Sequence, residues 1–213
     1  MEKAQTDKLP GLLVVLSGPA GVGKTTVAAK LLERPGFLRS VSATTRPMRS
    51  GEVDGRDYSF VTREQFGRLQ DQNELIEYAE VFGNQYGTPK QPLRDAISKR
   101  QVMLLTIDVH GGQQVAGKQL DALLIFLTPP SKLELTRRLE KRATESAAEQ
   151  AKRLARAAEE LKLASEFYDA VVVNDDLDSC VRKVGEEIDK RRLLLKARLE
   201  KGETLYRGLG KSA

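Results

Sequence analysis

The sequence contains no tryptophan, one cysteine and one histidine, and only 5% of its residues are aromatic. The lone Cys180 cannot form a disulfide within the chain, so we expect a reducing, cytoplasmic location. No run approaches the roughly 18–20 apolar residues that span a bilayer, and residues 1–10 lack a signal-peptide core. Aromatic surfaces that stack single-stranded bases are scarce. We therefore expect neither a membrane nor a nucleic acid as partner.

The overall composition is that of a globular protein with room for one well-buried domain. Apolar residues make up 40% of the 213 residues and charged residues 31%, with a formal net charge of +5. A positive excess suits phosphorylated small molecules, nucleic acid or an acidic surface, so charge alone does not identify the partner. We expect a monomer or a small homo-oligomer.

Short apolar runs alternate with helical patterns along most of the chain. Residues 12–16 are all apolar, which is typical of a strand buried on both faces of a parallel sheet. Further strands are predicted at 102–107, 123–127 and 170–173. Helices are predicted at 25–33, 91–99, 131–142, 149–167 and 177–199, with Ser131 as an N-cap. This order predicts an α/β fold built around a mostly parallel sheet.

Two regions interrupt the alternation. Residues 44–89 hold short alternating segments, tyrosines and glycines, and they predict an inserted subdomain with its own small sheet. Residues 137–156 are polar and rich in alanine and arginine, which suggests a helical lid. The core of the single domain then comprises residues 10–43, 90–136 and 157–200. We expect the basic run 190–196 to dock through its leucines and the tail 202–213 to be frayed.

A glycine-rich segment between the first strand and the first helix matches the P-loop pattern in full. In such a loop, backbone N–H groups and the helix N-terminus bind phosphate oxygens. The lysine supplies a cation to the β- and γ-phosphates, and the Thr25 hydroxyl can ligate Mg²⁺. The predicted ATP-binding residues here are Gly18, Pro19, Ala20, Gly21, Val22, Gly23, Lys24, Thr25 and Thr26.

The P-loop identifies a nucleoside triphosphate but not the reaction, because GTPases, ATPases, helicases and small-molecule kinases all use it. A second signal lies in the insert, where Arg46 and Arg49 stand three residues apart and Tyr58 follows. Two guanidinium groups at this spacing can hold a phosphate monoester through bidentate, charge-assisted hydrogen bonds. The acceptor is therefore expected to be a phosphorylated small molecule.

At these residues the chain resembles the guanylate kinase family. The resemblance extends over about residues 12–190 and includes the segments 44–60, 74–79, 83–88, 129–131 and 173–177. It implies a P-loop kinase fold with a GMP-binding insert and a lid, and transfer of the γ-phosphoryl group of MgATP to GMP, and by extension to dGMP. ATP and GMP are the implied partners, and Mg²⁺ the implied cofactor.

The resemblance also implies roles for individual residues. The GMP phosphate is assigned to Arg46, Arg49, Tyr58 and Tyr86, and the guanine to Ser42, Glu77 and Thr88. Asp108 is also assigned to GMP binding. The Glu77 carboxylate can accept from the N1–H and 2-amino groups of guanine, which adenine lacks. Arg138, Arg142 and Arg153 occupy the positions of lid arginines, which clamp the transferring phosphoryl group together with Lys24. Asn174 is placed near the adenine of ATP, and Glu52 is expected to shape its loop.

Two positions depart from the family pattern. Ala20 stands where many members have serine, and Thr106 where an acid is usual, whereas Asp108 is kept. We expect Thr106 and Asp108 to lie on one side of the same strand, at its carboxyl end. His110 is expected to occupy a turn or a helix terminus rather than to act as a general base, because phosphoryl transfer depends mainly on positioning and charge.

Three alternatives remain open. The chain could be a P-loop kinase for another phosphorylated acceptor, although Glu77, Ser42 and Thr88 favour guanine. Guanylate-kinase-like domains also serve as catalytically inactive protein-interaction modules, but such modules usually lack a working P-loop, which is complete here. RNA binding through the basic charge would appear as an affinity that falls steeply with salt.

Overall fold

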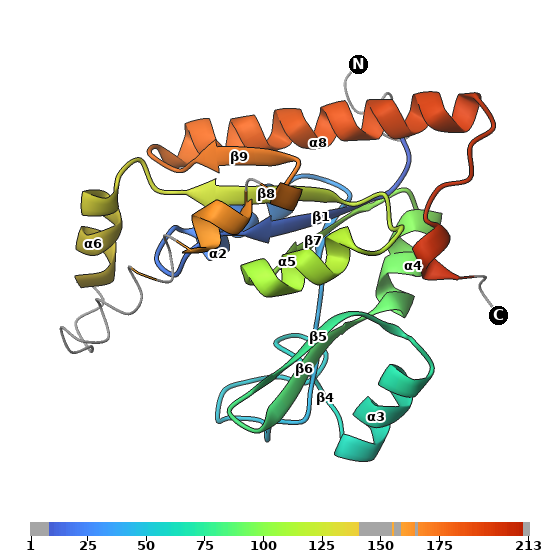
Figure 1. The fold of residues 1–213 in the computed structure, drawn as a ribbon. Helices are drawn as coiled ribbons and strands as arrows, with labels where there is room; N and C mark the ends of the chain where they lie inside the picture. Colours follow the sequence, from blue (N-terminus) through green and yellow to red (C-terminus); the bar gives the residue numbers. More distant parts are fainter. Residues whose placement is uncertain (1–8, 141–154, 156–158, 165, 211–213) are drawn as a thin grey trace.

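The computed structural model describes residues 9–140, 155, 159–164 and 166–210, whose arrangement is shown in Figure 1. Its central sheet has five strands in the order β2-β7-β1-β8-β9, and every neighbouring pair is parallel. The strands are β1 Leu12–Ser17, β2 Phe37–Arg39, β7 Val102–Thr106, β8 Leu123–Thr128 and β9 Ala170–Val173. The predicted α/β fold with a parallel-sheet core is confirmed.

Helices cover both faces of this sheet, as Figure 1 shows. They are α2 Lys24–Leu32, α4 Lys90–Ser98, α5 Val109–Ala116 and α8 Leu177–Glu200. Side chains of β1 alternate between the two faces, so Leu12 and Val14 join the cluster that includes α2 and α8 residues. Leu13 and Val15 join the cluster on the side of α4 and α5. Cys180 of α8 is fully buried in the first cluster and serves packing, as predicted.

A second, four-stranded sheet lies beside the core, in the order β4-β3-β6-β5 (Figure 1). Its elements are β3 Ala43–Thr44, β4 Ser59–Phe60, α3 Arg63–Asp71, β5 Leu75–Val81 and β6 Asn84–Pro89. Phe66 of α3 packs on Ala43 and Leu75 in a separate small cluster. The predicted small sheet is present, but helix α3, which begins at a Thr62 capping box, was not predicted. The boundaries drawn for the insert and the lid stay predictions.

Helix α6, Lys132–Glu140, starts before the segment assigned to the lid and includes its first four residues, 137–140. The Ser131 hydroxyl accepts from the Glu134 backbone N–H at 3.1 Å, so Ser131 is the predicted N-cap. Most of residues 137–156 lie outside the described residues, as do Arg142 and Arg153. Within the described part of the chain, no helix is long and apolar enough to cross a membrane.

The C-terminal segment differs from the expectation of a frayed tail. Residues 202–210 fold back onto the core and include the short 3-10 helix η1, Arg207–Leu209. Leu205 and Leu209 are buried, and the Tyr206 hydroxyl donates to the Gly11 carbonyl at 2.6 Å. Arg94 of α4 donates to the Leu209 carbonyl at 2.7 Å. The expectation is wrong for these residues because apolar burial and backbone pairing hold them in place.

Candidate active site

The P-loop adopts a conformation that only glycine tolerates at three positions. Gly18, Gly21 and Gly23 have φ values of 143°, 83° and 98°. A Cβ on Gly18 would lie 2.3 Å from the Leu127 carbonyl oxygen, and one on Gly23 would lie 2.5 Å from Asn174 Nδ2. The loop joins the carboxyl end of β1 to the N-terminus of α2, which is where an α/β fold binds phosphate.

Lys24 begins helix α2 and folds back over the loop. Its Nζ donates to the Gly18 carbonyl at 2.5 Å and to the Pro19 carbonyl at 3.1 Å. Thr25 and Thr26 follow in the first helical turn and are exposed. Among the residues the structure describes, no group of three or more His, Cys, Asp or Glu side chains could hold a metal ion by itself. A protein hydroxyl that shares a metal with nucleotide phosphates and water still fits Mg²⁺.

Asn174 contacts the backbone of the P-loop, and Arg138 contacts Asn174. The Asn174 side chain is buried, and its Nδ2 donates to the Val22 carbonyl at 2.7 Å. Arg138 Nη1 donates to the Asn174 carbonyl at 3.0 Å, while its Nε donates to Glu134 at 2.8 Å. The side-chain amide of Asn174 therefore bonds to the P-loop backbone, and Arg138 of α6 is linked to the loop by its hydrogen bond to Asn174.

Glu77, on β5, is a buried carboxylate, with 7% of its surface exposed. Thr88 Oγ1 donates to Glu77 Oε1 at 2.5 Å, and the Ser42 hydroxyl lies 3.3 Å from Thr88 Oγ1. Because the Thr88 proton points to Glu77, Ser42 is the donor in the second bond. Burial, followed by the charge of Asp108, raises the pKa of Glu77, whereas the Thr88 bond and Lys118 act in the opposite direction. Among the described residues, no donor bonds the second carboxylate oxygen.

Asp108 lies beyond the end of its strand, contrary to the expectation that it shares a strand face with Thr106. Strand β7 ends at Thr106, and Asp108 is the N-cap of α5, accepting from the Gly111 N–H at 3.0 Å. A helix begins here because the Asp108 carboxylate satisfies a free N–H of the first turn. Thr106 is exposed and lines a small cavity of about 80 Å³ with Ser42 and Tyr58. His110 is exposed in the first turn of α5.

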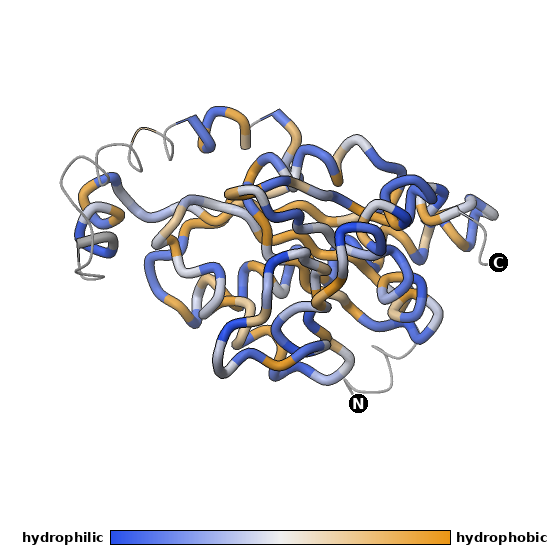
Figure 2. The backbone as a smooth tube through the Cα atoms, turned by 90° about the horizontal axis from the view of Figure 1, so that it is seen from below, coloured by the Kyte–Doolittle hydropathy of each residue, from blue (hydrophilic) through white to orange (hydrophobic). Residues whose placement is uncertain are grey.

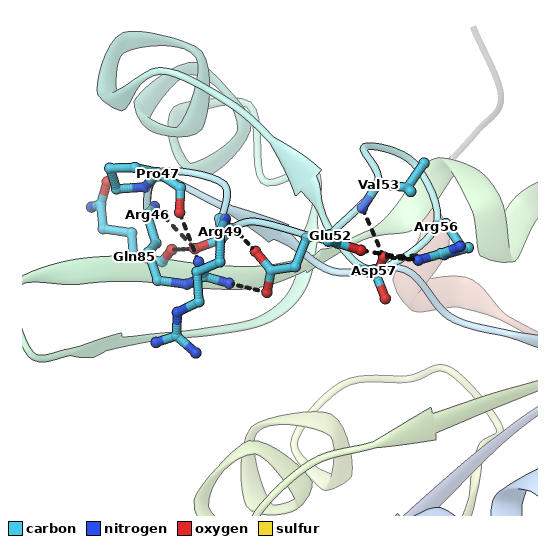
Figure 3. A network of polar contacts seen from close by, with 10 residues as sticks. Arg46, Pro47, Arg49, Glu52, Val53, Arg56, Asp57 and Gln85 are labelled. Atoms are coloured by element: carbon cyan, nitrogen blue, oxygen red, sulfur yellow. Dashed lines mark hydrogen bonds and ion pairs between the residues drawn. The ribbon is translucent and has the colours of Figure 1, made fainter.

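Arg46 and Arg49 lie in the loop between β3 and β4 and have different partners (Figure 3). Arg46 Nη2 donates to Glu52 Oε1 at 2.8 Å, and the Arg49 backbone N–H donates to Glu52 Oε2 at 2.8 Å. Glu52 thus shapes the loop, as expected. Glu52 is the main cause that raises the pKa of Arg46, and Arg46 is the main cause that lowers the pKa of Glu52. In Figure 3 the Arg49 guanidinium points away from this network.

Both predicted tyrosines stand beside Arg46. The Tyr58 and Tyr86 rings meet edge to face with centroids 5.9 Å apart, and the Arg46 guanidinium lies 5.5 Å from the Tyr58 centroid. The structure therefore brings Arg46, Tyr58 and Tyr86 together on one side of the small sheet. Ser42, Glu77 and Thr88 form a second group on neighbouring elements of the same sheet.

Two residues that were not singled out from the sequence, Gln114 of α5 and Lys118 just after it, contact the strand that carries Glu77. The Gln114 amide exchanges two hydrogen bonds with the Tyr78 backbone, and Lys118 Nζ donates to the Leu75 carbonyl at 2.8 Å. Gln114 lies in α5 and Lys118 lies two residues beyond its end, so no local pattern in the sequence marked the two as a pair.

The features described so far define a P-loop kinase: a parallel central sheet, a complete P-loop and a second, four-stranded sheet. The guanylate kinase family model matches residues 11–191, so the chain belongs to the guanylate kinase family. It is 49% identical over 185 residues to the guanylate kinase of Novosphingobium aromaticivorans, covering 86% of this chain and 83% of that protein. It is 47% identical over 182 residues to that of Synechocystis sp., covering 83% and 95%.

A solved structure supports the fold independently. The crystal structure of guanylate kinase from Anaplasma phagocytophilum matches with a TM-score of 0.66 and 39% sequence identity, over 87% of this chain and 88% of that one. The predicted P-loop kinase fold and the predicted family are both confirmed.

Proposed function

We propose that the protein transfers the γ-phosphoryl group of MgATP to GMP, and also to dGMP, giving ADP and GDP. The observation that carries the proposal is the buried Glu77 carboxylate, which has one oxygen bonded by Thr88 and the other without a donor among the described residues. Guanine presents two adjacent donors, N1–H and the 2-amino group, which match such a carboxylate. Adenine presents neither, so its binding would leave a buried charge without compensation.

The phosphate of GMP is assigned to Arg46, Arg49, Tyr58 and Tyr86. Glu52 holds Arg46 with its guanidinium 5.5 Å from the Tyr58 ring centroid and 5.7 Å from the Phe60 ring centroid, which supports a preorganised phosphate site. The Arg49 guanidinium points away from Glu52 and is available to a ligand (Figure 3). Phosphate binding by two guanidinium groups and two hydroxyls then sets the acceptor oxygen for in-line attack.

The triphosphate of ATP is assigned to the P-loop, residues 18–26. Binding requires Lys24 to exchange its two bonds to the loop carbonyls for phosphate oxygens, where its charge acts on the transferring group. Thr25 would hold Mg²⁺ together with the phosphates, and the ion neutralises the developing charge when it is bound. Asn174 supports this site by fixing the loop backbone at Val22.

The lid is assigned to residues 137–156, with Arg138, Arg142 and Arg153 as cations for the transition state. Arg138 is one helical turn from Glu134 and contacts the Asn174 carbonyl beside the P-loop, which supports a role close to the nucleotide. Closure of the lid and insert excludes water, so that transfer to GMP prevails over hydrolysis.

A coupled assay of ADP release with GMP, AMP, CMP and UMP as acceptors tests the proposal. We expect turnover with GMP to exceed turnover with each other monophosphate by at least 100-fold in kcat/KM. Equal use of AMP would reject guanine recognition by Glu77, and ADP release that needs no acceptor would reject the kinase activity itself.

A further inference from the structure

Strand β5 is irregular at the residue proposed to read guanine. Leu75 pairs with Pro89 and Tyr78 with Gly87, so three steps along β5 correspond to two along β6. One residue is therefore inserted between Leu75 and Tyr78, which is the definition of a β-bulge. Glu77 lies within this bulge, where the regular ladder does not determine its position.

The bulge lies where the two sheets meet. Leu75 packs with Phe66 in the small apolar cluster of the four-stranded sheet, whereas Ile76 packs with residues of the main core. Glu77 comes next and bonds Thr88. Three consecutive side chains thus enter three different environments, so a small backbone displacement at this point moves the carboxylate directly.

Helix α5 and the turn that follows it hold the bulged segment at both ends. On one side, Lys118 Nζ donates to the Leu75 carbonyl at 2.8 Å. On the other, the Tyr78 N–H donates to Gln114 Oε1 at 3.1 Å and Gln114 Nε2 donates to the Tyr78 carbonyl at 2.9 Å. Strand β5 is the edge of its sheet, so the Gln114 amide pairs with backbone groups that no neighbouring strand can reach.

The same helix approaches Glu77 closely between these two contacts. A Cβ built on Gly111 would lie 3.4 Å from Glu77 Oε2, so a glycine at this position leaves the carboxylate room beside the helix. Lys118 is also close enough to favour ionised Glu77, while Asp108 disfavours it. Through these contacts, α5 and the turn after it fix the position of the carboxylate proposed to bind guanine.

We infer that Gln114 and Lys118 are positioning residues, which hold the bulge of β5 so that Glu77 meets the N1–H and 2-amino groups of guanine together. This inference rests on the proposed function. Loss of either contact lets the segment 75–78 shift, and the carboxylate then loses alignment with two donors at once. The consequence is a loss of discrimination by the base site, with the P-loop unaffected.

The test compares GMP with IMP, which keeps N1–H but lacks the 2-amino group. Gln114→Met keeps the length and helix propensity of the side chain but removes both hydrogen bonds. Gln113→Met is the matched control, because Gln113 is exposed on the same helix. For Gln114→Met we expect kcat/KM for GMP to fall about tenfold, mainly through KM. We also expect the GMP-to-IMP ratio of kcat/KM to fall about fivefold, while KM for ATP stays within twofold.

Lys118→Met tests the inference independently if Gln114→Met does not fold. It is expected to lower the GMP-to-IMP ratio of kcat/KM as well. Lys118→Arg, which can still donate to the Leu75 carbonyl, should restore at least half of it. An unchanged GMP-to-IMP ratio in the folded variants, or an equal change in Gln113→Met, would overturn the inference. Wild type is assayed first: no GMP phosphorylation there refutes the proposed function, whereas a GMP preference that the variants keep refutes only the positioning role.

Discussion

Glu77→Gln separates the recognition of guanine from the binding of ATP. The amide keeps the size of the carboxylate and can still accept from Thr88 through its oxygen. The position of the second oxygen then carries an NH₂ group, which faces the donors of guanine instead of accepting from them. A charge-assisted hydrogen bond contributes about 1.5–3 kcal/mol, so GMP binding should weaken roughly tenfold to 150-fold.

Isothermal titration with GMP and, separately, with MgATP measures this effect. We expect the ATP affinity of Glu77→Gln to stay within twofold of wild type. Glu80→Gln is the control, because Glu80 is exposed on the same strand. Unchanged GMP affinity, or a loss confined to ATP, would refute the assignment of Glu77 to the base.

Glu77→Gln is expected to weaken GMP binding but not to lower the stability of the fold. Burial raises the pKa of Glu77 in the folded protein above its usual value. The folded state therefore holds this proton more tightly than the unfolded state, and stability is lost as the pH rises from the ordinary pKa of a glutamate through the raised pKa of the folded state. At pH 7 the neutral glutamine avoids that cost, so Tm should equal or exceed that of wild type. GMP affinity of wild type should fall as the pH drops through the raised pKa of Glu77.

Three further predictions address the other parts of the molecule. Lys24→Met should lower kcat by roughly 10²–10³, a loss of about 3–4 kcal/mol in the transition state, and near-normal turnover by steady-state assay would contradict its role. Thr106→Asp should change kcat/KM for GMP by less than about fivefold, since Thr106 is exposed and a carboxylate there stays solvated; a tenfold gain would show that an acid is missing there. Tyr206→Phe removes the bond to the Gly11 carbonyl and should lower Tm by about 2–4 °C at unchanged kcat, whereas an unchanged Tm would show that the C-terminal segment is not held by this bond.

Local sequence patterns predicted the fold well where the structure depends on local rules. The apolar run at 12–16, the glycines of the P-loop and the alternation of strands with helices each reflect backbone preferences that a short segment carries by itself. Strand β9 was predicted with its observed bounds, and the N-cap at Ser131 was predicted as well. The hydropathy colouring in Figure 2 shows apolar segments gathered in the interior, as those runs indicate.

Long-range pairing explains what the sequence did not reveal. The basic run 190–196 was expected to dock through its leucines, which is confirmed for Leu195, fully buried in the core, but not for Leu193 and Leu194, which are more than half exposed. Arg192 is buried instead, and it donates to the carbonyls of Leu9 and Pro10, over 180 positions away. A buried arginine satisfied by backbone oxygens leaves no local pattern, because its partners come from a distant segment.

The candidate site shows the same division. The resemblance to a family pointed to Glu77, Thr88 and Ser42 as site residues. That Ser42 bonds Thr88 and Thr88 bonds Glu77 became clear only from the pairing of their strands in the structure. Neither the bulge between Leu75 and Tyr78 nor the contact from Gln114 could be predicted, since both depend on how α5 packs against the edge of another sheet.

The most direct test of the account follows the phosphoryl group itself. Wild-type protein is incubated with Mg²⁺, GMP and ATP labelled with ³²P at the γ-position, and the products are separated by chromatography. The account predicts that the label appears in GDP in a one-to-one ratio with the ADP formed, and that AMP in place of GMP accepts almost none. Label recovered as inorganic phosphate, or transferred equally to AMP, would contradict it.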